Sequence, residues 1–258
     1  MDIRTLILIY AGGNILQALS MQYVRRVHAD YPAARLWANG SLLLASGLML
    51  LFLRGVVPPF VSIAIGNSLI MGGAVVINFG TAVATGRAPP WRWAIGLWLL
   101  FVALFIWAIT LGRDVVTLEH RVLVFSLFGM LIQGYAVWVC VRVVDDALRP
   151  SFYILGLLNF LNFLVMAMRA WAVLQGGLAD LFQGTTEQVL LYSFNIVFVF
   201  LTSVTYTVIA GQRLQTVLQQ MAMHDPLTSA LNRREFANRA QRAWSSAARH
   251  HRPLSILM

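Results

Sequence analysis

The sequence predicts an all-α membrane protein, in which a bundle of seven transmembrane helices precedes a cytoplasmic helix and the beginning of a soluble domain. Three observations predict this fold class. Only 11% of the 258 residues are charged, 59% are apolar and the mean hydropathy is +0.72, whereas soluble domains carry about 25% charged residues. Seven apolar stretches are each long enough to cross a bilayer. Near residue 224 the chain turns polar.

A spanning helix needs roughly 20 mostly apolar residues. Stretches of this kind are separated by short segments with helix breakers or charges, such as RGVVPP, TGRAPP and VDDALRP. The first stretch has no basic segment ahead of it and is too long for a cleaved signal peptide, so we expect it to be retained. The predicted spans are 3–24, 36–53, 60–84, 91–111, 122–143, 151–175 and 188–210.

The arginines of the short loops predict the orientation, because cytoplasmic loops are enriched in basic residues. Seven arginines fall in the loops on one side and four in the loops on the other. Residues 211–258 add seven arginines and two acids to the first side. We therefore expect the N-terminus outside, the C-terminus in the cytoplasm, and contact between the basic tail and anionic lipids. Tryptophans near the span ends fit two aromatic belts, an inner one of Trp37, Trp91, Trp93 and Trp138 and an outer one of Trp107 and Trp171.

The sequence lacks the residues that several functional classes require. Cys140 is the only cysteine, so no intrachain disulfide or cysteine-rich zinc site is expected, and the side chain suits the interior of a membrane helix. No Asp or Glu lies deep in a predicted span, which argues against a coupled transporter but leaves a simple channel open. We expect no metal or cofactor in this chain. Nucleic acid is the other interpretation of a basic tail, but nothing else in the sequence supports it, and none is expected as a partner.

Three predicted spans carry their polar residues on one helical face. Hydrocarbon satisfies neither amides nor a guanidinium, so these faces should point into the bundle. Two interpretations stay open: hydrogen bonds between helices, or a polar cavity that binds a small-molecule or lipid ligand from the outer half. The stripes are Asn67, Asn78 and Thr81; Asn159, Asn162, Met166 and Arg169; and Gln188, Tyr192, Asn195, Thr202 and Tyr206. The candidate ligand-binding residues among them are Asn67, Asn78, Asn159, Asn162, Arg169, Tyr192 and Asn195.

Arg169 is the only charged residue well inside a predicted span. Three roles stay open for it: an ion pair with Asp180 or Glu187 of the outer loop, extension of the side chain toward water, or contact with an anionic ligand.

Small residues in two other spans permit close helix packing. They are Ser41 and Ala45, and Ser68 and Gly72.

Residues 211–223 predict an amphipathic helix that continues the last span. Leu214, Leu218 and Met221 recur at i, i+4 and i+7. In a homodimer this apolar seam would form a short coiled coil, although two turns are too few to be stable alone. The segment is either a signalling helix that transmits movement of the last span or an inert linker.

Residues 224–236 read HDPLTSALNRREF. Pro226 disfavours helix at Asp225, and Leu227 is suited to anchor the following turn. Asn232 is a good N-cap, because Glu235 follows three residues later as in a capping box. A helix is predicted from there to about Arg249, followed by PLSILM as the beginning of a buried strand. The face predicted to be buried on this helix consists of Phe236, Ala240, Ala243 and Ala247.

The pattern H-D-P-L-T-x-x-x-N-R-R-x-F, a helix and then R-P-L-S-I-L-M resembles the beginning of a GGDEF domain, the diguanylate cyclase module of bacterial signalling. Ser229 and Ala230 stand where the family usually has Gly and Leu. The resemblance covers residues 224–258, the first part of such an α/β domain. The matching residues are Asp225, Pro226, Leu227, Thr228, Asn232, Arg233, Arg234 and Phe236.

The resemblance implies a multi-pass protein of the bacterial inner membrane whose GGDEF domains meet in a homodimer and join two GTP into cyclic di-GMP with Mg²⁺. In the family the metal-binding and guanine-contacting residues follow the strand that PLSILM begins, so we expect this chain to be an inactive fragment. The implied organisation is a sensor at 1–210, a signalling helix at 211–223 and the truncated start of a GGDEF domain at 224–258. Two alternatives remain: a parent whose GGDEF domain is degenerate or followed by a phosphodiesterase domain, and a seven-span channel or transporter.

Overall fold

The computed structural model of the chain describes residues 2–28, 31–110, 116–175, 185–223 and 233–250, together with Pro253 and Ser255. Within this part the chain is almost entirely helical and contains no strand. Seven of the described helices are long and apolar enough to cross a membrane, which confirms the predicted set of spans. The chain divides into two units, Met1–Ala210 and Gly211–Met258, which are described separately below.

The helices of the first unit follow the predicted spans, and local sequence determines where each begins. Proline occupies the first turn of α2 and of α6, where its missing N–H costs no hydrogen bond. Thr117 caps α5 through a capping box with His120, so α5 begins four residues before the predicted span and includes Arg121. The helices are α1 (Ile3–Val27), α2 (Pro32–Phe52), α3 (Gly66–Ala84), which follows the π-helical segment η1 (Phe60–Ile65), α4 (Trp91–Ile109), α5 (Leu118–Val141), α6 (Arg149–Leu174) and α7 (Thr186–Met223).

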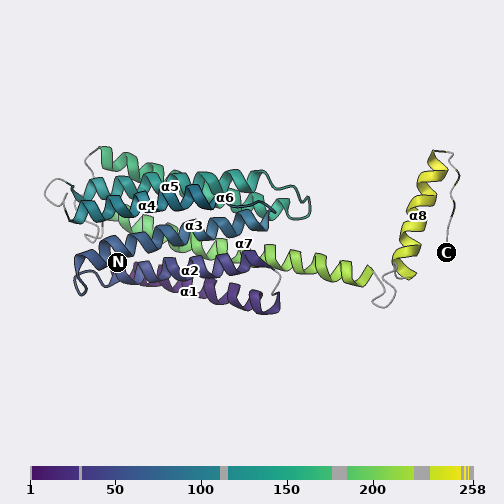
Figure 1. The fold of residues 1–258 in the computed structure, drawn as a ribbon, viewed down its shortest axis with the longest axis horizontal. Helices are drawn as coiled ribbons and strands as arrows, with labels where there is room; N and C mark the ends of the chain where they lie inside the picture. The colour runs from purple at the N-terminus through teal and green to yellow at the C-terminus, as the bar shows by residue number, and fades with distance from the viewer. Residues whose placement is uncertain are drawn as a thin grey trace. The chain divides into compact units, whose positions relative to one another are not determined.

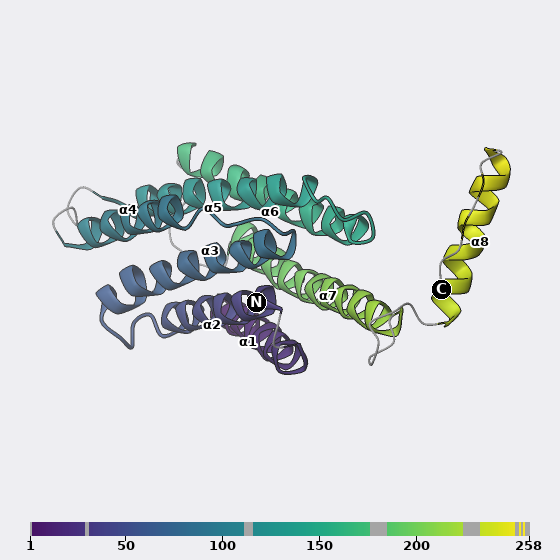
Figure 2. The ribbon, with the colours of Figure 1, turned by 45° about the vertical axis from the view of Figure 1, so that its right-hand side comes forward.

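Successive helices run in opposite directions, so the bundle has two ends. We call the end where α1 begins the Ile3 end and the other the Val27 end. Extensive backbone contacts join α2 to α3, α1 to α2, and α5 to α6, and α1 and α2 lie side by side in Figure 1. α3 also contacts α5 and lies between the α1–α2 pair and the α4–α6 group (Figure 2).

Two pairs of glycines bring α2 and α3 into backbone contact. A Cβ on Gly73 would lie 2.6 Å from the carbonyl oxygen of Gly40, and a Cβ on Gly47 would lie 2.5 Å from that of Gly66. Both distances are far below van der Waals contact, so only glycine permits this approach. The seven-residue spacing within each helix lets the two antiparallel helices meet at both pairs.

Of the small residues that the sequence indicated for close helix packing, Ser41, Ser68 and Gly72 make other contacts. A Cβ on Gly72 would lie 2.9 Å from Nε1 of Trp98 on α4, so Gly72 makes room for an indole rather than for the backbone of another helix. The same Nε1 donates a hydrogen bond to the carbonyl oxygen of Ser68 at 3.0 Å. Ser41 is fully buried and donates within its own helix to the carbonyl of Trp37.

The Val27 end of the bundle is sealed by a buried aromatic layer. Trp37 is fully buried, and its ring stacks on that of Tyr206 with 4.4 Å between centroids. Its Nε1 donates to the hydroxyl of Thr81 at 3.3 Å. The prediction that Trp37 lies in an interfacial belt is therefore wrong, because its N–H finds a partner inside the bundle. Phe152 and the free thiol of Cys140 belong to the same fully buried cluster.

The second unit contains the end of α7 and α8 (Arg233–Arg249). The face of α8 predicted to be buried is only partly covered in the described structure, since Phe236 is 42% exposed and Ala243 is exposed, whereas Ala240 and Ala247 are half-buried. On α7, Leu214 is half-buried and Leu218 is 55% exposed. The side chains of Met221 and Arg234 lie outside the described residues, as do Asp225, Leu227, Thr228, Asn232 and nearly all of the predicted strand.

Candidate functional site: a polar cavity in the seven-helix bundle

One cavity inside the first unit is lined by all of the candidate ligand-binding residues. Its volume is about 170 Å³, similar to an engineered protein cavity of about 150 Å³ that holds benzene. Three helices that are distant in sequence supply the candidates: α3, α6 and α7. The residues brought together are Asn67, Asn78, Asn159, Asn162, Arg169, Tyr192 and Asn195.

The cavity is long, narrow and closed at one end. Its lining runs from Leu118 to Gln133 on α5 and from Leu191 to Tyr206 on α7, which at 1.5 Å per residue is about 22 Å along each helix. It begins near the Ile3 end, where Arg54 and Leu118 lie. At the Val27 end it stops at Tyr206, whose ring is stacked on the buried Trp37.

The asparagines of the lining hydrogen-bond within their own helices. In each case the side-chain nitrogen donates to the carbonyl oxygen four residues earlier, at 2.7 to 3.0 Å. Only the nitrogen donates, so this bond also identifies the amide oxygen. For these side chains, the interpretation that the polar stripes join neighbouring helices is therefore wrong. The asparagines that do this are Asn14, Asn67, Asn78, Asn159 and Asn195.

Buried hydrogen-bond acceptors without a partner remain along the cavity. The side-chain oxygens of Asn162, Gln133 and Gln17 are buried and accept no hydrogen bond within the described structure. All three residues line the cavity, and Asn162 is only 5% exposed. An unsatisfied buried polar atom costs about 1–3 kcal/mol, so these oxygens favour an occupant with hydrogen-bond donors, whether water or ligand.

Arg169 lies in the wall of the cavity over the ring of Phe125. Its guanidinium carbon is 5.7 Å from the ring centroid of Phe125 on α5, and its charge interacts with Tyr192 on α7. Of the three roles left open for Arg169, the ion pair with Glu187 does not form in the described structure, and Glu187 is exposed. The other predicted partner, Asp180, lies outside the described residues.

Two further arginines line the cavity at the Ile3 end, and sequence reasoning missed both. Arg121 belongs to the first turns of α5, and its buried Nε has no hydrogen-bond partner in the described structure. Arg54 follows α2 and is close enough for its charge to repel that of Arg121. Tyr192 interacts electrostatically with both Arg54 and Arg169. We call Arg54, Arg121 and Arg169 the arginine cluster; no Asp or Glu is among the described residues that line the cavity.

The first helix contributes a polar stripe that the sequence analysis also missed. Tyr10, Asn14 and Gln17 line the cavity from α1. Their spacing of i, i+4 and i+7 is the signal that identified the other stripes, so the same criterion would have found them. Gln133 on α5 also has a polar partner at helical spacing, Ser126 seven residues earlier, so the same criterion would have drawn attention to this face of α5.

The last helix of the bundle, α7, packs against α1 beside the cavity. It meets α1 where a Cβ on Gly13 would lie 2.8 Å from Val199, and where the hydroxyls of Ser20 and Thr207 are 3.5 Å apart. Val199 also lines the cavity, so this contact between α7 and α1 lies at the cavity wall.

Comparison with protein-family models, with curated proteins and with solved structures finds no match. Within the described ranges, no three His, Cys, Asp or Glu side chains are grouped in a way that would hold a metal ion. The chemistry of the cavity itself is therefore the basis for interpreting the site.

Proposed function

We propose that residues 1–210 are a membrane sensor whose cavity binds a small anionic molecule, and that the sensor regulates a GGDEF domain beginning near residue 224. The ligand would control the synthesis of cyclic di-GMP from two GTP, with Mg²⁺ as the metal of the output domain. The observation that carries the proposal is the convergence of arginines and amides from five helices and the segment after α2 on one cavity.

An anion fits the charge of the cavity. Three guanidinium groups line it without a carboxylate among the described lining residues, and two of them repel each other. Arg121 and Arg169 form no ion pair among the described residues, and charged groups in a span are costly unless they are paired or hydrated. A carboxylate or phosphate beside these two arginines would offset the repulsion between Arg54 and Arg121 and accept charge-assisted hydrogen bonds from the planar guanidinium groups.

A sensor fits the shape of the cavity better than a channel or a transporter does. A conduction pathway must reach both ends of the bundle, whereas this cavity stops at the stacked rings of Tyr206 and Trp37. The Val27 end beyond them is filled by the buried cluster that includes Phe152 and Cys140. A ligand therefore enters and leaves from the Ile3 end.

The route to an output is α7. This helix is continuous from Thr186 to Met223, so it carries cavity-lining residues and the segment 211–223 on one element. A ligand shifts a conformational equilibrium only by its difference in affinity for the two states. Contacts from Tyr192 and Asn195 on α7 to a ligand held by Arg169 on α6 would supply that difference. The output itself is inferred from the resemblance of residues 224–258 to the start of a GGDEF domain.

Ligand binding is tested on the purified full chain in detergent micelles by thermal unfolding with pairs of molecules that differ only in charge. Benzoate against benzamide, and hexanoate against hexanamide, fit the volume of the cavity. We expect at least one anion to raise the Tm while its neutral amide does not. Arg169→Gln should abolish this shift, whereas Arg26→Gln, an exposed arginine at the Val27 end, should retain it. Equal shifts from anions and amides would overturn the charge argument.

The output is tested in cells that express the complete gene product. We expect cyclic di-GMP, measured by mass spectrometry, to respond to the anion that raises the Tm. Arg169→Gln should remove the response and leave the basal level unchanged, because the substitution lies far in sequence from the output domain. Binding without any change in cyclic di-GMP would refute the GGDEF output while retaining the sensor.

A further inference from the structure

A second group of arginines lies at the opposite end of the bundle, on its outer surface. Arg87 follows α3, and Arg142 follows α5. The guanidinium carbon of Arg87 is 5.1 Å from the ring centroid of Trp138, and that of Arg142 is 5.2 Å from the same centroid. The Nη2 of Arg87 also donates to the carbonyl oxygen of Arg142 at 2.8 Å. Both guanidinium groups therefore lie against the ring of Trp138, and their carbon atoms are at most about 10 Å apart.

These two cations keep unused hydrogen-bond donors. The Nε of Arg87 is buried and has no partner in the described structure. Among the described residues, neither Arg87 nor Arg142 forms an ion pair with a carboxylate. The neighbouring Asp146 is paired with Arg149 at 2.6 Å. Two adjacent positive charges with free donors suit a phosphate group.

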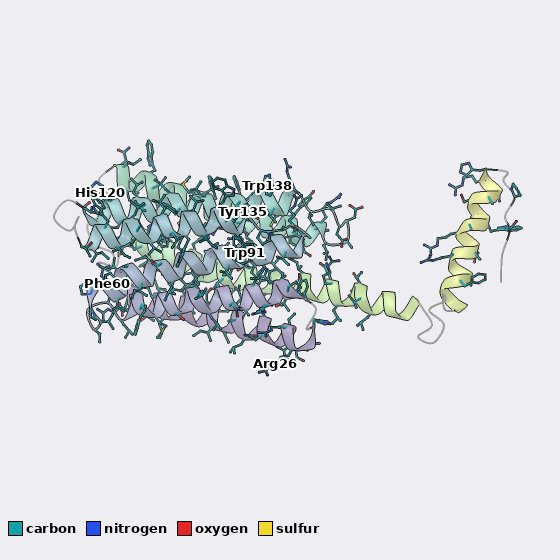
Figure 3. All side chains as sticks on the ribbon, in the orientation of Figure 1. Arg26, Phe60, Trp91, His120, Tyr135 and Trp138 are labelled. Carbon is teal, nitrogen blue, oxygen red and sulfur yellow. The ribbon has the colours of Figure 1, made fainter. Side chains whose placement is uncertain are left out.

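An apolar groove continues from this pair along the bundle. Tyr135 stacks on Trp138, with ring centroids 6.0 Å apart, and forms the wall of the groove nearest to it. The groove has a volume of about 150 Å³ and lies between α3, α4 and α5. It follows α4 from Pro90 to Trp98, a length of about 12 Å at 1.5 Å per residue. Figure 3 places Trp91, Tyr135 and Trp138 in the same half of the bundle, with His120 and Phe60 at the opposite end.

Two features of the groove indicate a lipid rather than a soluble ligand. Its described walls are almost entirely apolar, with Asn78 and Tyr135 as the polar residues, and it lies beside α4, the span with the smallest share of buried residues. α4 therefore leaves the largest share of its residues for contact with the bilayer. Tryptophan, tyrosine and arginine at the end of a span are typical of the level of the lipid headgroups.

We propose that Arg87, Arg142 and Trp138 bind the headgroup phosphate of an anionic glycerophospholipid, with one acyl chain in the groove between α3, α4 and α5. The phosphate accepts hydrogen bonds from both guanidinium groups, and Tyr135 lies where the glycerol backbone joins the chain. The site selects anionic lipids, because a zwitterionic headgroup brings its own cation beside two arginines. It is separate from the arginine cluster of the cavity and does not depend on the proposed sensor function.

The test uses the purified full chain in mixed micelles of phosphatidylglycerol and phosphatidylcholine. Lipid molecules retained on release into the gas phase are counted by native mass spectrometry. We expect preferential retention of one phosphatidylglycerol. An arginine near anionic lipid contributes about fivefold to affinity. In the double variant Arg87→Gln with Arg142→Gln, the preference for phosphatidylglycerol over phosphatidylcholine should therefore fall roughly 25-fold.

Two further variants separate a site from general surface charge. Arg92→Gln removes an exposed arginine that lies at the same end of the bundle and is not one of the two arginines over Trp138, and it should leave retention unchanged. Ala94→Trp fills the groove without changing any charge and should reduce retention to the level of the double variant. Equal retention of both lipids, or an equal loss in Arg92→Gln, would overturn the proposal. A thermal melt of each variant identifies any loss that comes from misfolding.

Discussion

The contact between α2 and α3 makes Gly73→Ala the most sharply determined perturbation of the bundle. The new Cβ would lie 2.6 Å from the carbonyl oxygen of Gly40 and 2.6 Å from the backbone nitrogen of Leu44. Both neighbours are backbone atoms, so no side chain is able to rotate away. Carbon atoms in contact normally lie about 3.5–4.0 Å apart, and the two helices must therefore separate by roughly 1 Å.

The expected cost follows from two opposing effects. Overpacking a tight interface typically costs about 1–3 kcal/mol, and two backbone clashes put this variant toward the upper half of that range. Alanine gains about 1 kcal/mol of helix propensity over glycine. The net loss in the free energy of unfolding is therefore about 1–2 kcal/mol.

Gly12→Ala is the matched control, because a Cβ on this glycine of α1 would meet no atom within 4 Å. It gains the same helix propensity without a clash, so the two variants should differ by about 2–3 kcal/mol. The assay is reversible unfolding of the purified chain in mixed micelles, with helicity measured by circular dichroism. If Gly73→Ala is as stable as Gly12→Ala, the backbone contact between α2 and α3 is wrong.

Three further predictions concern the sealed end of the bundle. Trp37→Ala should lower the free energy of unfolding by about 3–5 kcal/mol, whereas Trp37→Phe should cost about 1 kcal/mol for the lost hydrogen bond to Thr81; equal costs would contradict the stacked, hydrogen-bonded ring. Cys140 should resist a membrane-permeant maleimide in the folded protein and react after unfolding in SDS, because it is fully buried. Proteoliposomes should show no anion flux, and measurable flux would mean that the cavity is not blind.

The number and order of the spans were predictable from sequence, because a bilayer requires long apolar runs and tolerates few interruptions. The ends of the spans were less predictable, since they depend on local capping. The hydrogen bonds between Thr117 and His120 start α5 at Leu118, and this shift moves Arg121 from a predicted loop into the wall of the cavity. The residue was visible in the sequence, but its role depended on a cap that hydropathy does not reveal.

The contacts between helices could not be predicted from the sequence, for a different reason. The sequence does not distinguish Gly40 and Gly73 from Gly12. A Cβ on Gly40 or Gly73 would clash with the backbone of the facing helix, whereas a Cβ on Gly12 would meet no atom within 4 Å. Trp37 has the position of an interfacial anchor, and only the proximity of Tyr206 and Thr81 makes it a core residue. Both outcomes depend on the rotation of one helix against another, which periodicity within a single helix does not determine.

The polar stripes of different helices line one cavity, because the bilayer penalises polar groups in the same way on every helix. Each stripe must therefore face inward, and the inward faces meet.

The direction of each helix also explains why the arginines form two groups, one that lines the cavity and one that lies on the surface. Arg54 follows α2, Arg121 lies in the first turn of α5 and Arg169 lies in the last two turns of α6, so alternation of helix direction alone brings all three to the half of the bundle nearest the Ile3 end, where they line the cavity. Arg87 and Arg142 follow α3 and α5, so the same alternation brings them to the Val27 end. There the interior is already filled by Trp37 and its neighbours, and the two arginines must lie outside, on Trp138. The sealed layer therefore determines both proposed sites: it closes the cavity below the first set of arginines and excludes the second set from the interior.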